Sequence, residues 1–222
     1  MVQVVPAGRP EASEQYPPGG RSAGKRQAII DAAAALFLEH GYQGTSMDDI
    51  AALAAVSKQT VYKNFADKQQ LFSHIVLGAA ARADAFIAAL PRVLADSDDL
   101  AAGLRALARQ YLATVMQPRL LQMRRLIVSE SGRFPDLARA YYERVPEHVM
   151  TSLAAQFGEL AGHGLLRIDD PAMAAGHYAF LVLGAPLDRA MFLGPGHGLS
   201  EADLDRHADE AARAFLAAYG PA

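Results

Sequence analysis

Three helix-start signals follow one another closely in this chain, at Ser46, Ser57 and Asp67. Each has a side-chain oxygen that can accept a hydrogen bond from the first amides of a helix. Asp49 and Gln70 stand three residues after two of these signals, at the position that completes a capping box. The stretch is therefore restricted to short helices, because each new cap requires that the preceding helix has ended.

Apolar residues at helical spacing surround these caps. A first helix is predicted from Ser22 to His40, and Gly41 ends it. In the two short helices that follow, we expect four side chains to point inward, those of Ile50, Leu53, Val61 and Phe65. A longer helix followed by two short helices, with the brief break 54–56 between them, predicts a helix-turn-helix.

The outward face of the second short helix is polar. It carries hydrogen-bond donors and acceptors suited to base edges and phosphates, at Lys58, Gln59, Thr60, Tyr62 and Lys63. The same pattern also fits the solvated surface of an ordinary helical bundle. The spacing of the caps alone leaves both interpretations open.

The rest of the chain is predicted to be helical as well. Turn signals divide it into roughly five helices, at Pro91, 96–99, Pro118, 132–135, 162–164, Pro171 and 194–198. Pro146 lies inside the longest predicted helix, 136–160, and is expected to kink or split it. No segment alternates polar and apolar residues as a half-buried strand does, so the predicted fold class is all-α.

Composition excludes several other classes of protein. Cysteine is absent and the net charge is −3, which argues against disulfides, thiol chemistry and indiscriminate coating of nucleic acid. No apolar run reaches the length of a membrane span, and residues 1–21, rich in proline and glycine, are predicted to be a disordered tail. These features favour a cytoplasmic protein without a membrane partner.

No motif indicates catalysis. The seven histidines show no zinc-binding spacing, and Ser129 to Ser131 lack the context of a nucleophile elbow. The glycine-rich run 194–198 has no phosphate-loop Lys-Ser/Thr pair. We therefore expect no enzyme activity, no metal and no cofactor.

The segment from Arg26 to Gly78 resembles a known family along its whole length. Its pieces AAALFLEHGYQGTSMDDIAALA, VSKQTVYKNF and DKQQLF are similar to the N-terminal domain of the TetR family of transcriptional regulators. The resemblance implies three parts, a tail (1–21), a helix-turn-helix DNA-binding domain of three helices (22–82) and a helical ligand-binding and dimerisation domain (83–222).

The resemblance also implies individual roles. Thr45, Ser46, Lys63 and Lys68 match positions that contact phosphates, whereas Lys58, Gln59 and Thr60 match the groove-facing start of the recognition helix. Tyr62 matches an aromatic residue that lies against the DNA backbone. Lys25 and Arg26 could touch the backbone from the first helix, or simply form a solvated helix end.

Residues 100–193 resemble, more loosely, the C-terminal domain of the AefR-like branch. This resemblance implies a cavity for a small hydrophobic or amphipathic effector, with candidate lining residues Tyr111, Met116, Leu120, Met123, Phe134, Tyr141, Tyr142, Phe157, His177 and Phe180. Plain core packing is the alternative for each of them.

The last two helices are the expected dimer surface. Two apolar stripes fall there, one of Phe180, Leu181, Leu187 and Met191 and one of Ala211, Ala212, Phe215 and Tyr219. Monomer core is the alternative. The expected function is a one-component, homodimeric repressor that binds a palindromic operator in double-stranded DNA, and the alternative is a helical small-molecule-binding or scaffold protein that does not bind DNA.

Overall fold

Helices make up nearly all of the regular structure in the computed structural model, which describes residues 18–95, 99–194 and 199–221. No strand occurs in those residues, and the predicted all-α class is confirmed. In chain order the elements are α1 (Pro18–His40), α2 (Met47–Leu53), α3 (Lys58–Asn64), α4 (Lys68–Gly78), α5 (Ala80–Ala95), α6 (Leu100–Val115), α7 (Pro118–Glu130), α8 (Pro135–Tyr142), the π-helical turn η1 (Glu143–Glu147), α9 (His148–Gly162), α10 (Pro171–Leu193) and α11 (Glu201–Tyr219).

The first helix begins earlier than the sequence pattern predicts. α1 starts at Pro18, and the part of the predicted tail from Pro18 to Arg21 is helical. Proline is well suited to the first turn of a helix, where its missing N–H has no intrahelical partner to bind. Residues 1–17 of the predicted tail lie outside the described residues.

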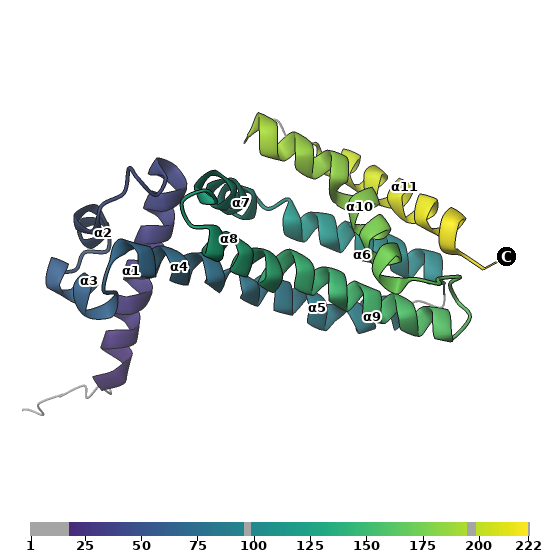
Figure 1. The fold of residues 1–222 in the computed structure, drawn as a ribbon, viewed down its shortest axis with the longest axis horizontal. Helices are drawn as coiled ribbons and strands as arrows, with labels where there is room; N and C mark the ends of the chain where they lie inside the picture. The colour runs from purple at the N-terminus through teal and green to yellow at the C-terminus, as the bar shows by residue number, and fades with distance from the viewer. Residues whose placement is uncertain (1–17, 96–98, 195–198, 222) are drawn as a thin grey trace, which may run out of the picture.

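A long helical run joins the two halves of the molecule (Figure 1). The run Lys68–Leu94 is long and apolar enough to cross a membrane by length and composition, and 41% of its most apolar window is buried. α4 packs against α1 and α8, and α5 packs against α6 and α9, so we interpret the run as a core helix. The predicted break at Pro91 is wrong, because Pro91 lies inside α5.

Two apolar cores flank this run. The N-terminal core is built from α1 to α4, and four buried residues of α7 and α8 complete it, Met123, Leu126, Ile127 and Tyr141. The C-terminal core begins at Ala83 and unites α5, α6, α9, α10 and α11. The corner between α7 and α8 therefore belongs structurally to the N-terminal half.

Two prolines shape the C-terminal helices. Pro146 splits the predicted helix 136–160, as expected, and lies in the π-helical turn between α8 and α9. Pro186 lies inside α10, where its missing N–H leaves the carbonyl of Val182 without the usual helical donor. The ring nitrogen Nε2 of His207, on α11, lies 3.0 Å from that carbonyl oxygen and satisfies it.

Candidate DNA-binding site and ligand cavity

The second helix of the motif is fixed by a complete capping box. The Ser46 Oγ accepts a hydrogen bond from the Asp49 amide, and the Asp49 carboxylate accepts one from the Ser46 amide. The Ser46 hydroxyl also donates to the Asp49 carboxylate, at 2.6 Å. This bond, together with the one from the Ser46 amide, holds the pKa of the Asp49 carboxyl below its usual range. The predicted cap is confirmed, and the Ser46 hydroxyl is engaged in it.

The turn between α2 and α3 has a strained residue at its centre. Ala55 has a φ of 51°, in the left-handed region that favours glycine. The Val56 amide donates to the Ala51 carbonyl, a bond that closes the C-terminal end of α2. This turn brings α2 and α3 into contact with each other.

The recognition helix α3 has one buried and one exposed face. Val61 and Phe65 are buried, as predicted, and they anchor α3 on the N-terminal core. The Ser57 Oγ caps the helix by accepting from the Thr60 amide. Four side chains are exposed on the other face, those of Lys58, Gln59, Tyr62 and Lys63, and Thr60 is half-buried beside the Ser57 hydroxyl. The exposed face therefore offers donors and acceptors that α3 itself does not use.

Lys58 is paired within the protein. Its Nζ lies 2.8 Å from a carboxylate oxygen of Asp48 on α2, and that contact raises the pKa of the lysine. Both side chains are exposed, and an exposed ion pair is readily exchanged because water and salt compete with it. Lys58 can therefore exchange this carboxylate for a phosphate or a base edge.

Two of the residues expected to contact phosphate have structural roles instead. Thr45 is buried, and its hydroxyl donates to the Gly41 carbonyl. The Lys68 Nζ donates to the backbone carbonyls of Tyr42 and Thr45, each at 2.8 Å. Burial and the nearby Arg133 lower the pKa of Lys68. We therefore remove the side chains of Thr45 and Lys68 from the candidate DNA contacts.

Leu53 also differs from its predicted position. Its side chain is 56% exposed, whereas Ile50 is fully buried as expected. α2 has only seven residues and turns a single narrow face to the core, so an apolar residue at its C-terminal end lies outside that face.

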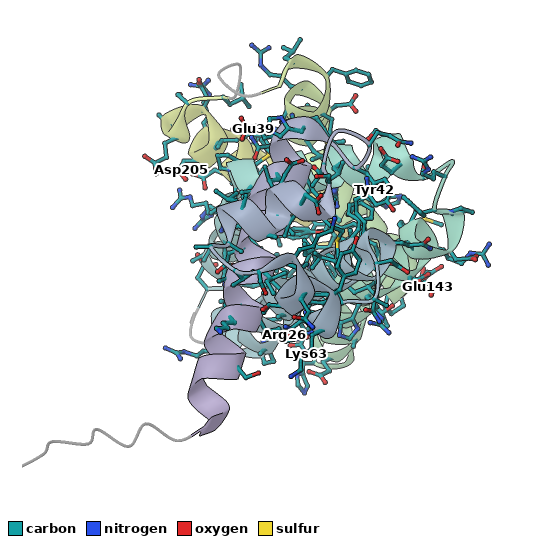
Figure 2. All side chains as sticks on the ribbon, turned by 90° about the vertical axis from the view of Figure 1, so that its left-hand side faces the viewer. Arg26, Glu39, Tyr42, Lys63, Glu143 and Asp205 are labelled. Carbon is teal, nitrogen blue, oxygen red and sulfur yellow. The ribbon has the colours of Figure 1, made fainter. Side chains whose placement is uncertain are left out.

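Arg26 connects three helices rather than reaching outward. Its guanidinium lies 4.8 Å from the centre of the Phe65 ring, and its Nη1 lies 3.3 Å from the His74 Nε2. Lys25, one residue earlier, is exposed. Figure 2 views the molecule from this end and shows Lys63 and Arg26 on the same side of it, apart from Tyr42.

A cavity of about 590 Å³ lies between the corner formed by α7 and α8 and the helices α9 and α10. Four of the predicted residues line it, Tyr111, Tyr141, Tyr142 and Phe180. Leu120 lines a smaller neighbouring cavity of about 50 Å³. Phe180 and Tyr142 are more than half exposed, so the larger cavity opens to the surface of the protomer.

The other five predicted lining residues lie outside both cavities, Met116, Met123, Phe134, Phe157 and His177. Phe157 and Met116 pack in the C-terminal core, and Met123 is buried in the N-terminal core. Phe134 packs edge-on or tilted against aromatic rings of the DNA-binding half, and His177 is hydrogen-bonded to a tyrosine of α11. Apolar character alone did not separate cavity wall from core.

One whole wall of the cavity consists of residues that were not predicted from the sequence. Arg124, Ile127, Val128 and Ser131 line it from α7 and its C-terminal end. These residues are spaced i, i+3, i+4 and i+7, which is one face of a helix. That spacing could have identified them, but the arginine and serine gave the face no apolar periodicity.

The outer face of α10 carries several exposed apolar side chains. Phe180 is 75% exposed and Phe192 is 83% exposed, with Leu181 between them at 39%. The predicted stripe on α11 is wrong for Ala211, Ala212 and Phe215, which are buried within the protomer. α10 and α11 lie side by side at the edge of the C-terminal half (Figure 1).

A capped helix-turn-helix joined to a helical domain with its own cavity defines the class of one-component transcriptional regulators. Residues 29–75 match the model of the bacterial regulatory proteins of the tetR family. Residues 102–221 match the C-terminal domain of the AefR-like transcriptional repressors. The chain belongs to the TetR family.

Solved structures agree with this assignment over most of the chain. A TetR-family transcriptional regulator from Mesorhizobium loti is 44% identical, with a TM-score of 0.83, over 90% of this chain and 98% of that one. The flavonoid-responsive regulator FrrA is 36% identical, with a TM-score of 0.67, over the same shares of the two chains.

Curated relatives match over short stretches of the chain only. The regulator AcrR of Shigella flexneri is 44% identical over 50 residues, which are 22% of this chain and 23% of AcrR. The chain aligns with less than a third of the length of the curated relatives it matches.

Proposed function

We propose that this protein is a cytoplasmic, homodimeric repressor that binds a palindromic operator through α3 and releases it when an amphipathic ligand enters the cavity. The observation that carries the proposal is the division of α3 into a buried anchor, Val61 and Phe65, and an exposed polar face. The match of the C-terminal half to a repressor domain supports repression as the outcome of binding.

Dimerisation supports the DNA-binding step. A single short helix grips DNA weakly, whereas two copies held about 34–36 Å apart reach successive turns of one groove. The exposed apolar residues of α10 offer the surface for such pairing, because a face of this kind is unfavourable in water. We assign Phe180, Leu181 and Phe192 to the interface with a second copy of the chain.

The cavity supports the ligand-responsive step. Its volume, about 590 Å³, lies within the range of small-molecule sites, and its walls are mainly apolar. FrrA, 36% identical over 90% of this chain, is named as flavonoid-responsive. A flavonoid is therefore the first effector to test, by its effect on operator affinity.

The alternative function is a helical binding protein that no longer contacts DNA. The dependence of DNA affinity on salt concentration distinguishes the two functions. We assign the reading of base edges in the groove to Lys58, Gln59 and Thr60. Phosphate contacts are assigned to Lys63 and Tyr62 on α3, and to Ser46 at the N-terminal end of α2. Lys63 is exposed and no ion pair is found for it in the described residues. A scaffold protein would show no steep dependence of DNA affinity on salt.

Lys63→Met and Lys68→Met form a matched pair of lysine removals. In Lys63→Met we expect the slope of log affinity against log salt to fall by about 0.9 per phosphate contact, thus about 1.8 per dimer. Lys68→Met should instead lower the free energy of unfolding by about 1–2 kcal/mol, because two backbone carbonyls lose a charged donor. Filter-binding or anisotropy titrations at several salt concentrations and a urea melt measure both quantities. If Lys63→Met leaves the slope unchanged, α3 is not the DNA-contacting surface.

A further inference from the structure

The cavity contains a positive charge that the protein does not neutralise. Arg124, on α7, lines the cavity and is half-buried. No ion pair or hydrogen bond of its side chain is found within the described residues, whereas its neighbour Arg125 donates to the Ala190 carbonyl at 2.7 Å. A guanidinium taken partly out of water without a partner is costly, and a ligand can remove that cost.

Two buried phenols share the same part of the cavity. Tyr111 and Tyr141 line both the large cavity and the small one beside it, as Arg124 does. Burial raises the pKa of Tyr111 to about 12, although Arg124 acts in the opposite direction, so the hydroxyl stays protonated at neutral pH. No hydrogen bond of the Tyr111 hydroxyl is found in the part of the chain that the structure describes. Arg124 and this phenol are therefore donors without acceptors.

The opposing charge lies elsewhere in the cavity. Asp188, on α10, is the one acidic residue among the described lining residues, and it is exposed. It forms no ion pair with Arg124 within 4.0 Å in the described structure. Solvent screens an exposed carboxylate more strongly than a half-buried guanidinium. The inner part of the cavity is thus electropositive, and the remaining wall is mainly apolar.

We propose that the cavity binds an amphipathic anion whose carboxylate or phenolate pairs with Arg124 and accepts from the Tyr111 hydroxyl. The apolar body of the ligand then lies against Ile127, Leu183 and Met150. The inference rests on the proposed function, since it defines the charge of the effector that the cavity receives. A neutral ligand would bury the guanidinium without a counter-ion, and a cationic one would be repelled.

Two fluorescent probes that share one ring skeleton test whether the cavity prefers an anionic ligand. Anilinonaphthalene sulfonate is an anion, and phenylnaphthylamine is the same skeleton without the sulfonate. In Arg124→Met we expect the affinity for the sulfonate to fall by about tenfold or more. The affinity for phenylnaphthylamine should stay the same or rise, because the variant removes a guanidinium that the neutral probe leaves without a counter-ion. Arg119→Met, an exposed arginine on the same helix outside both cavities, should change neither affinity.

A cavity-filling variant shows where the probes bind. Gly184 lines the cavity, and a Cβ added there meets no atom within 4 Å. Gly184→Phe should lower the affinity for both probes to a similar extent. Fluorescence titrations on the full chain, with melting curves to show that each variant is folded, provide the affinities.

Each result bears on the inference. If Arg124→Met leaves sulfonate binding unchanged, or weakens both probes equally, the proposed anion pairing is overturned. If neither probe binds the unaltered protein, or Gly184→Phe has no effect on either, the cavity is not the binding site and the inference is also overturned. Operator binding, measured on the same samples, reports separately on the DNA-binding function.

Discussion

Leu181→Arg is expected to convert the protein to a monomer and to weaken operator binding by about 10²- to 10⁴-fold. Leu181 lies on the exposed apolar face of α10, between Phe180 and Phe192. Two arginines that face each other across a two-fold interface would repel and would have to lose water. Without the partner, a second recognition helix no longer binds at the high effective concentration that the dimer provides.

Leu165→Arg is the matched control for this change. Leu165 is also an exposed leucine, 45% accessible, but it lies in the segment between α9 and α10 rather than on α10. Analytical ultracentrifugation and operator titrations on both variants measure the effect. A Leu181→Arg protein that stays dimeric with full operator affinity would place the interface elsewhere.

Phe134→Leu is expected to uncouple the cavity from DNA. Ser131 and Ala138 line the cavity, and Phe134 lies between them in the chain. The Phe134 ring packs edge-on against Tyr42, with ring centres 4.8 Å apart, and against Phe72 at 5.8 Å. Leucine keeps an apolar side chain there but removes both ring contacts.

The path from Tyr42 leads directly to the recognition motif. Lys68 binds the carbonyls of Tyr42 and Thr45, and Thr45 immediately precedes the cap of α2. A ligand that moves the corner between α7 and α8 would therefore move the start of α2.

Thermodynamic linkage makes the coupling between the cavity and the DNA-binding site measurable before the natural effector is known. A typical coupling of about 1–3 kcal/mol changes the affinity of the second ligand by about 5- to 150-fold. We expect operator DNA to weaken anilinonaphthalene sulfonate binding within that range in the unaltered protein and by less than about twofold in Phe134→Leu. Operator affinity without probe should be nearly unchanged, because the ring contacts found for Phe134 in the described residues are with Tyr42 and Phe72, which lie outside α3. An unaltered coupling in Phe134→Leu would exclude this path.

The local signals in the sequence predicted the DNA-binding half well. Ser46, Ser57 and Asp67 cap α2, α3 and α4 as predicted, because a cap depends only on residues three or four positions away. The reciprocal contact of Gln70 is shifted by one residue, since its side chain accepts from the Ala66 amide rather than from the cap itself.

The errors concern residues whose environment is set by distant parts of the chain. Thr45 and Lys68 match a DNA-binding pattern, yet both are engaged by the loop between α1 and α2. Phe215 belongs to an apolar stripe that α6 and α10 cover within the protomer. The charge of Arg124 became informative only when the structure showed it beside an apolar cavity.

The identity of the sequences that the protein selects from a randomised pool of DNA duplexes tests the central claim most directly. The unaltered protein should enrich an inverted repeat with half-site centres about one helical turn, ~34–36 Å, or a multiple of it apart. Gln59→Ala should enrich the same repeat with relaxed preference at one symmetric pair of bases, at a cost of about 1–3 kcal/mol. Enrichment of no inverted repeat, or identical preferences in the Gln59→Ala protein, would contradict the placement of α3 in the groove.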